Sequence, residues 1–175
     1  MSEELFEKLN KYVKKNVNEH RYAHTLGVVK AATAYAKRFG ADVEKARIAA
    51  IFHDACKSNG PLEHGPAAAI LIQEKFGVED EDIINAIKYH TVGRANMSIL
   101  ERVIKCADLT DETRDYPNVE YFRNRLMNDD DINPVFLEMM LECKEIVEQR
   151  GQKFSKTSLE CIDWLKEEID RSNNG

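Results

Sequence analysis

Histidine and aspartate side chains recur through the first two thirds of the chain. In chain order they are His24, His53, Asp54, His64, His90 and Asp108. Imidazole nitrogens and carboxylate oxygens together suit iron, manganese or zinc, and no thiolate lies among them. A carboxylate has two oxygens, so Asp54 can bridge two ions. These groups therefore form a candidate site for one or two metal ions.

The adjacent pair His53-Asp54 is the strongest part of this pattern. It follows an apolar run of alanine, isoleucine and phenylalanine, which predicts burial. Burying an imidazole and a carboxylate together costs several kcal/mol unless both are satisfied, and a metal ion satisfies both. A single histidine such as His64 or His90 is more often a helix cap or a partly buried polar group. His20 is expected on the solvent side or behind the ligands.

Basic residues lie within a turn or loop of these candidate ligands. They are Arg21, Lys57, Arg94 and Arg114. Positive side chains at such positions can hold a phosphate beside a metal through charge-assisted hydrogen bonds. The other lysines and arginines, and the acidic clusters, are expected to be solvated helix faces.

Helices must position these residues, because apolar side chains recur at a helical period along most of the chain. The pattern predicts helices over residues 3–15, 19–39, 43–52, 66–76, 81–90, 99–108, 131–149 and 159–169. Asn18 and Asp42 are candidate N-caps, and two S/T-x-x-E pairs, Ser98–Glu101 and Thr157–Glu160, are candidate capping boxes. We therefore predict an all-α fold of about eight or nine helices.

Length and charge narrow the class of protein. The 175 residues fit one domain, with 43% hydrophobic residues and 25 basic against 31 acidic side chains, a net charge of −6. This acidic balance predicts no nucleic-acid partner, and an N-terminus without a continuous apolar run predicts no signal peptide or membrane span. Four cysteines without a C-x-x-C pair, Cys56, Cys106, Cys143 and Cys161, indicate reduced thiols and a cytoplasmic protein.

Four motifs in register resemble the HD superfamily of metal-dependent phosphohydrolases, and more closely its YqeK-type members, the symmetrical bis(5'-nucleosyl)-tetraphosphatases. The strings are His20–Thr25, Ala50–Asp54, Tyr89–Arg94 and Ala107-Asp108, followed by Arg114 and Pro117. The resemblance covers residues 19–119 in order. An HD pair alone is weak evidence for this resemblance, whereas four motifs in the same order are specific evidence for it.

The resemblance implies a single HD-type helical bundle over residues 1–175, with a motif core at 19–119 and C-terminal helices at 131–170 closing the site. The implied reaction splits diadenosine tetraphosphate into two ADP by attack of a metal-activated water on phosphorus. The implied cofactor is iron, as one or two ions, with manganese or another divalent metal as the alternative. A small nucleotide would be the partner, and a homodimer is left open.

Roles for single residues also come from the resemblance. His24, His53, Asp54 and Asp108 would hold the first metal, and His64 and His90 would complete a second metal position or contact phosphate. Arg21, Lys57 and Arg114 would bind phosphates, and Asp54, His53 and Lys57 would act in catalysis. Residues 153–157 would close over the nucleotide.

The chain departs from the family pattern in three places. The stretch between Asp54 and His64 is short, the acidic-proline signature reads Asp111-Glu112, and no aromatic stands at Ala55-Cys56. The missing proline is expected to loosen the loop that carries Arg114. No departure removes a proposed metal ligand.

Other activities also fit the ligand pattern. They are an HD-type nucleotidase or cyclic-nucleotide phosphodiesterase, a di-iron oxygenase, and a non-catalytic nucleotide sensor. Product analysis, a demand for O₂, and ligand binding without hydrolysis would distinguish them.

Overall fold

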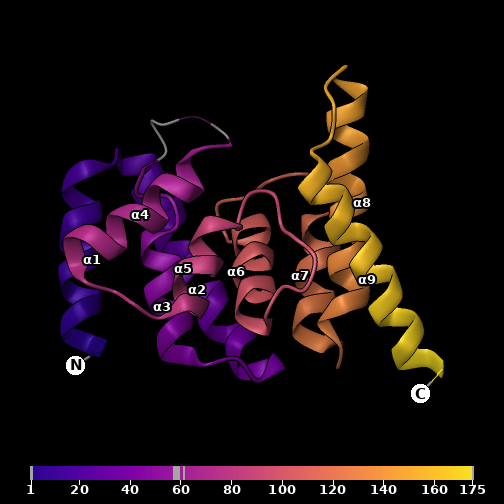
Figure 1. The fold of residues 1–175 in the computed structure, drawn as a ribbon, viewed down its shortest axis with the longest axis horizontal. Helices are drawn as coiled ribbons and strands as arrows, with labels where there is room; N and C mark the ends of the chain where they lie inside the picture. The colour runs from indigo at the N-terminus through magenta and orange to yellow at the C-terminus, as the bar shows by residue number, and fades with distance from the viewer. Residues whose placement is uncertain (1, 57–59, 61, 175) are drawn as a thin grey trace.

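The computed structural model of the chain describes residues 2–56, 60 and 62–174. Every regular element in these residues is an α-helix (Figure 1), which confirms the predicted all-α class. The helices are α1 (Ser2–Asn16), α2 (Glu19–Phe39), α3 (Val43–Phe52), α4 (His64–Phe76), α5 (Glu81–Lys88), α6 (Ile99–Thr110), α7 (Val119–Asn128), α8 (Ile132–Gln149) and α9 (Lys156–Asn174). Lys57, for which phosphate binding and catalysis were predicted, lies outside the described residues.

Most helices begin where the sequence predicts. The side chain of Asn18 accepts a hydrogen bond from Arg21 N at 2.8 Å and caps α2. The capping box of Ser98 and Glu101 is present at the start of α6. Each such cap satisfies backbone N–H groups that would otherwise lack a partner in the first turn.

Two predictions for the C-terminal half were wrong. The capping box of Thr157 and Glu160 does not start α9: the helix begins at Lys156, and Ser155 Oγ accepts from Ser158 N at 3.1 Å. Helix α7 falls in a stretch where no helix was predicted. It follows a proline turn and has charged flanks, and it buries one narrow stripe of three side chains, Val119, Phe122 and Leu126.

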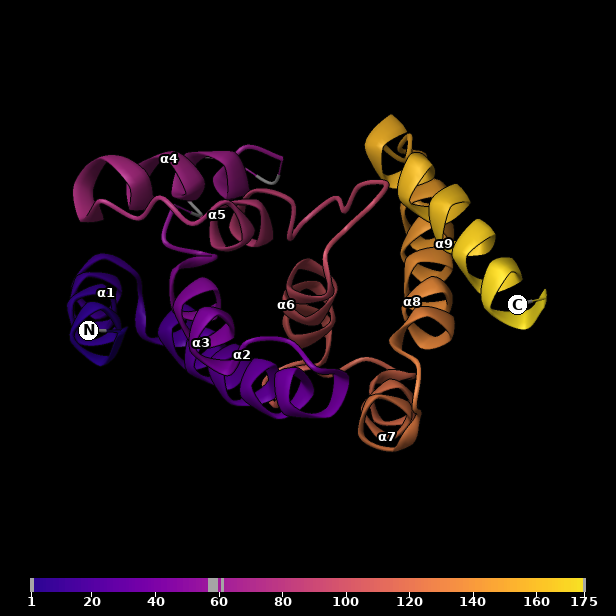
Figure 2. The same cartoon turned by 60° about the horizontal axis from the view of Figure 1, so that its bottom comes forward.

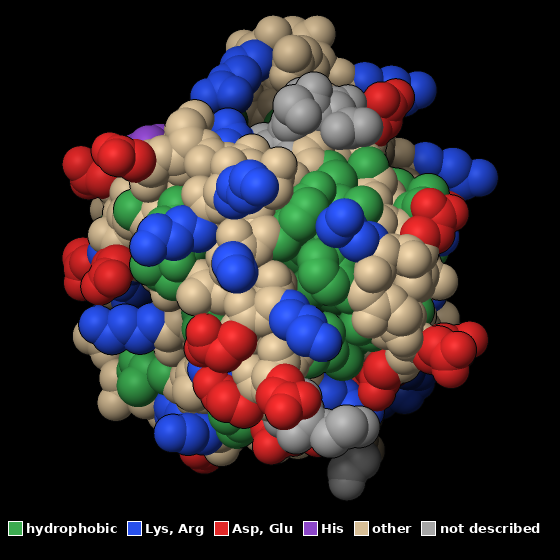
Figure 3. Space-filling model, turned by 90° about the vertical axis from the view of Figure 1, so that its left-hand side faces the viewer, with side chains coloured by type: hydrophobic (Ala, Val, Ile, Leu, Met, Phe, Trp, Pro, Cys, Tyr) green, Lys and Arg blue, Asp and Glu red, His purple; other side chains and the backbone are tan. Residues whose placement is uncertain are grey.

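The helices pack in two groups around α6. Helix α2 packs on α3 and α6, α4 packs on α5, and α5 packs on α6. Helices α8 and α9 pack on each other, and Figure 2 shows them on the opposite side of α6 from α3, α4 and α5. On the face shown in Figure 3, basic and acidic side chains are interspersed with hydrophobic ones.

An aromatic cluster holds the N-terminal helices together next to the candidate site. The rings of Tyr12, Phe52 and Phe76, from α1, α3 and α4, have centroids 5.5–5.9 Å apart. Phe52 is fully buried, and burying such a side chain contributes about 1.5–3 kcal/mol. Because His53 follows Phe52 directly, the core fixes the backbone from which the His53-Asp54 pair projects.

Two further predictions concern the chain's environment. Within the described part of the chain, no helix has both the length and the apolar character that crossing a bilayer requires. All four cysteines are free thiols; Cys106 and Cys161 are buried, while Cys56 and Cys143 are half-buried.

Candidate metal centre

Five helices bring the predicted ligands to one place. His24 lies on α2, His53 caps the end of α3, His64 opens α4, His90 follows α5, and Asp108 lies near the end of α6. Together with Asp54 they form two clusters, and within each the potential ligand atoms lie within 4.8 Å of one another. One cluster contains His24, His53, Asp54 and Asp108, and the other contains Asp54, His64 and His90.

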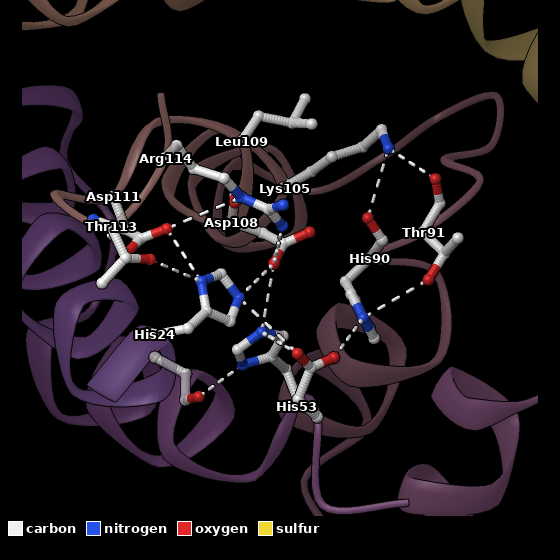
Figure 4. Close-up of polar contacts among 12 residues, drawn as sticks. His24, His53, His90, Thr91, Lys105, Asp108, Leu109, Asp111, Thr113 and Arg114 are labelled. Carbon is white, nitrogen blue, oxygen red and sulfur yellow. Dashed lines mark hydrogen bonds and ion pairs between the residues drawn. The ribbon is translucent and has the colours of Figure 1, made fainter. Parts of the chain in front are cut away.

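The first cluster surrounds the carboxylate of Asp108, as Figure 4 shows. Oδ1 of Asp108 lies 3.0 Å from His24 Nε2 and 3.2 Å from His53 Nε2. Asp54 Oδ2 lies 3.5 Å from His24 Nε2 and 3.6 Å from His53 Nε2. Two imidazole nitrogens and two carboxylates thus face a common point.

The second cluster uses the other oxygen of Asp54. Asp54 Oδ1 lies 3.3 Å from His64 Nε2 and 3.4 Å from His90 Nε2. The two Nε2 atoms are themselves 2.9 Å apart. Asp54 therefore presents one oxygen to each cluster, which is the arrangement that a bridging carboxylate requires.

The orientation of the imidazoles tests whether a cation fits. Nδ1 of His53, His64 and His90 each faces a backbone carbonyl, at 2.6, 3.0 and 2.7 Å. A carbonyl only accepts, so Nδ1 carries the proton and Nε2 of a neutral ring presents a lone pair. Two lone pairs 2.9 Å apart on His64 and His90 need a shared cation or proton between them. The donor set therefore fits a divalent metal.

Burial and charge keep the carboxylates ionised. Burial alone raises the pKa of Asp108, but the imidazoles of His24 and His53, when protonated, outweigh burial and hold that pKa well below its usual range. Burial likewise raises the pKa of Asp54, while the imidazoles of His53, His64 and His90, when protonated, lower it further than burial raises it. Negative charge is therefore maintained in the interior, where a cation compensates it best.

This environment shifts the pKa values of His24 and His90 in opposite directions. Burial lowers the pKa of His24, but hydrogen bonds and charges of Asp108 and Asp111 raise it to about 9. Burial dominates at His90 and lowers its pKa. The imidazole of His24 thus lies between two carboxylates, those of Asp108 and Asp111.

Gly65 allows the two histidines of the second cluster to meet. A Cβ at this position would lie 2.8 Å from Lys88 O and 3.1 Å from Ile87 O. Backbone atoms at the end of α5 therefore occupy the space that a side chain would need. The absence of a Cβ lets the start of α4 approach α5, so His64 reaches His90.

The predicted phosphate-binding arginines have different environments. Arg114 donates from Nε to Asp108 O at 2.8 Å, and its half-exposed side chain lines a cavity of about 720 Å³ at the α6–α7 loop. Arg21 lies one turn before His24, with Nη1 buried and without a hydrogen-bond partner among the described residues. Arg94 instead forms a bidentate pair with buried Glu101, so it supports the fold rather than the site.

The loop that carries Arg114 is firmly held despite the missing proline. Arg123 donates to three backbone carbonyls of this segment, Thr110 O, Asp111 O and Arg114 O, at 2.8, 2.6 and 2.9 Å. The expected loosening is therefore not observed in the hydrogen bonding. His20 is exposed, as expected.

Thr91 and Lys105 belong to the surroundings of the site, although the sequence pattern did not single them out. Thr91 Oγ1 lies 3.2 Å from His64 Nε2. Buried Lys105 donates to Thr91 O at 2.6 Å and to His90 O at 3.2 Å (Figure 4). The sequence signal for Lys105 was its position between Ile104 and the Cys106-Ala107 pair on α6.

The connection to α9 also reaches this region. Ser158 Oγ donates to Val92 O at 2.7 Å and ties the start of α9 to the loop after His90. The segment 153–157 precedes this contact directly. Its predicted closure over a nucleotide stays a prediction.

Comparison with known proteins identifies the family to which the chain belongs. The HD domain model matches residues 21–113, a stretch that contains every residue of both clusters. The chain belongs to the HD-domain family. A solved HD-domain structure from Clostridium acetobutylicum, described as a predicted HD superfamily hydrolase involved in NAD metabolism, superposes with a TM-score of 0.84 at 31% identity. The match covers 95% of this chain and 97% of that one.

Curated relatives carry the name symmetrical bis(5'-nucleosyl)-tetraphosphatase. The Bacillus subtilis protein is 36% identical over 87% of this chain and 93% of its own length. The Halalkalibacterium halodurans protein is 40% identical over 67% of this chain and 74% of its own length. A Staphylococcus aureus protein of the same name is 25% identical over 94% of this chain and 96% of its own.

Proposed function

We propose that this HD-domain protein is a symmetrical bis(5'-nucleosyl)-tetraphosphatase that splits diadenosine tetraphosphate into two ADP. The observation that carries the proposal is the pair of ligand clusters that share the two oxygens of Asp54. Relatives that carry the tetraphosphatase name support this substrate, since they match the chain over most of its length.

The site residues divide into metal ligands and phosphate binders in this proposal. His24, His53, Asp54 and Asp108 hold one divalent ion, and His64 and His90 hold a second with Asp54. An ion bound there supplies a water of lowered pKa and polarises a phosphoryl oxygen. Nitrogen and oxygen donors without thiolate suit iron, which we propose as the resident metal, and also suit manganese.

Arg114 and Arg21 bind the phosphates in this proposal. Arg114 is anchored through Asp108 O, and its guanidinium borders the open cavity at the α6–α7 loop. Nη1 of Arg21 is buried, has no hydrogen-bond partner in the part of the chain that the structure describes, and offers a donor one turn from His24. Positive charge placed where negative charge leaves with ADP stabilises the transition state.

The test of the reaction is product analysis with metal-loaded protein. Protein stripped of metal and reloaded anaerobically with Fe²⁺ or Mn²⁺ should convert diadenosine tetraphosphate to ADP alone, followed by chromatography. AMP with ATP would indicate asymmetric cleavage and contradict the proposal. Consumption of O₂, or tight nucleotide binding without turnover by either loaded form, would favour an oxygenase or a sensor.

Replacement of Arg114 by alanine should weaken catalysis without emptying the metal centre. Loss of one positioned donor typically costs about 10²–10³ in rate, so we expect a fall in kcat/KM of about this size, while bound metal measured by elemental analysis stays unchanged. Arg150→Ala is the control, because Arg150 is exposed at the end of α8 and should leave kcat/KM unchanged. Normal activity of Arg114→Ala would remove this residue from the site.

Further features of the protein belong to the same proposal. Free thiols at all four cysteines support a reducing compartment and hence the cytoplasm. We also propose that α8 and α9 close the site, since Ser158 contacts the loop after His90. A homodimer stays a prediction that light scattering of the purified protein would decide.

A further inference from the structure

A carboxylate outside both ligand clusters contacts the back of His24. Asp111 caps the end of α6, and only 1% of it is exposed. Its Oδ1 lies 2.8 Å from His24 Nδ1, the ring nitrogen opposite to the Nε2 that faces Asp108 (Figure 4). Asp111 thus touches a proposed metal ligand without joining the proposed ligand set.

The second oxygen of Asp111 is held by the residue's own loop. Oδ2 accepts from Thr113 N at 3.0 Å and from Thr113 Oγ1 at 2.7 Å. Arg114 Nε lies 3.7 Å from Oδ1, and the backbone carbonyl of Asp111 accepts from Arg123. With both oxygens and the backbone engaged, the carboxylate has a defined orientation toward His24.

Gly27 makes room for this carboxylate. Gly27 lies on α2, one turn after His24, and a Cβ there would be 2.5 Å from Asp111 Oδ2 and 3.3 Å from its Cγ. Glycine in a helix interior lowers the intrinsic helix preference. Gly27 therefore lowers the intrinsic stability of α2 but leaves the space that the Asp111 carboxylate needs to contact His24.

His24 differs from the other histidines of the centre in what holds its Nδ1. Nδ1 of His53, His64 and His90 faces a neutral backbone carbonyl, whereas Nδ1 of His24 faces a carboxylate. A carboxylate partner fixes the tautomer with the proton on Nδ1 and makes Nε2 a stronger ligand.

We propose that Asp111 is the positioning residue of this metal centre: it keeps the proton of His24 on Nδ1 and directs Nε2 to the metal, in a space that Gly27 leaves open. The inference rests on the proposed metal site and adds a residue that holds a ligand without contacting metal or substrate.

Replacement of Asp111 by asparagine separates this role from packing, because the two side chains have nearly the same shape. The amide has one acceptor and one donor end. If its oxygen faces His24, its NH₂ meets the N–H of Thr113; if its NH₂ faces His24, the proton of His24 must move to Nε2 and block the ligand. Either orientation impairs the centre.

The measured quantity is the affinity of metal-free protein for Co²⁺, determined by competition with a chelator and by the visible absorption of the bound ion. We expect Asp111→Asn to weaken Co²⁺ binding about 10–100-fold. Glu101→Gln is the matched control, because Glu101 is an equally buried carboxylate on α6 that pairs with Arg94 instead of a proposed ligand. It should lower the melting temperature of the metal-free protein and leave Co²⁺ affinity within about threefold of wild type.

Gly27→Ala is the second variant, and it decides the matter if Asp111→Asn does not fold. Alanine favours the helix but displaces the carboxylate, so this variant should fold and still bind Co²⁺ at least about tenfold more weakly. Wild-type affinity in folded Asp111→Asn or Gly27→Ala would overturn the inference alone. A wild-type protein that binds no Co²⁺ would instead overturn the proposed metal site.

Discussion

Asp54→Asn should abolish both metal retention and hydrolysis. Asp54 is the residue common to the two clusters, and each of its oxygens faces different imidazoles. Mutation of a residue that hydrogen-bonds a metal ligand typically lowers metal affinity or activity about 10–100-fold. Loss of a ligand shared by two ions should therefore lower metal affinity and kcat/KM by more than about 100-fold. Elemental analysis of the purified variant, with product formation from diadenosine tetraphosphate, measures both effects.

The amide keeps the shape of the aspartate, so the loss should come from coordination and not from packing. Asp163→Asn provides the control, since Asp163 is exposed on α9 and should retain wild-type metal content and activity. An Asp54→Asn protein with a full complement of metal and normal turnover would exclude Asp54 as a bridging ligand. It would also leave the two clusters without a chemical connection.

Gly65→Ala should destabilise the fold and separate the histidines of the second cluster. The added Cβ would meet Lys88 O at 2.8 Å and Ile87 O at 3.1 Å, and backbone atoms cannot rotate away as a side chain does. Overpacking costs about 1–3 kcal/mol, which outweighs the helix-propensity gain of at most about 1 kcal/mol. At about 2–4 °C per kcal/mol for a protein of this size, a net loss of up to about 2 kcal/mol should lower the melting temperature by up to several degrees.

The same change should reduce activity more strongly than stability alone accounts for. A displacement of about 1 Å at a catalytic site can cost 10²-fold in rate, and Gly65 is adjacent to His64. Ile70→Ala on the exposed side of α4 is the control and should change unfolding free energy by less than about 0.5 kcal/mol. If Gly65→Ala melts and turns over like wild type, the close approach of α4 and α5 is not required.

Local sequence patterns were sufficient for most of the helices but not for all of them. Caps such as Asn18 and Ser98 act within one turn, so they can be identified without the fold. Helix α7 was missed because its single apolar stripe is short and its stability depends on packing against α6 and α8. Isolated helices of this length are marginal in water, so tertiary contacts decide whether they form.

The roles of the basic residues near the site also depend on tertiary contacts. Arg94 lies four residues after His90 and was a candidate for phosphate, yet its guanidinium pairs with Glu101 across the turn into α6. Arg114 is six residues from Asp108 and returns to it through the α6–α7 loop. The number of residues between an arginine and a proposed ligand does not distinguish Arg94 from Arg114. The path of the intervening loop decides whether the arginine side chain lies beside the site.

Periodicity and capping act over a few residues, so they were enough to predict the all-α class and most helix starts, and the order of imidazole and carboxylate groups is read directly from the chain. The tertiary structure alone decided which Asp54 oxygen faces which cluster, how closely α4 approaches α5, and that Asp111 contacts His24. These features depend on the approach of helices far apart in the chain. Packing of whole helix faces sets that approach, and a one-dimensional pattern does not contain it.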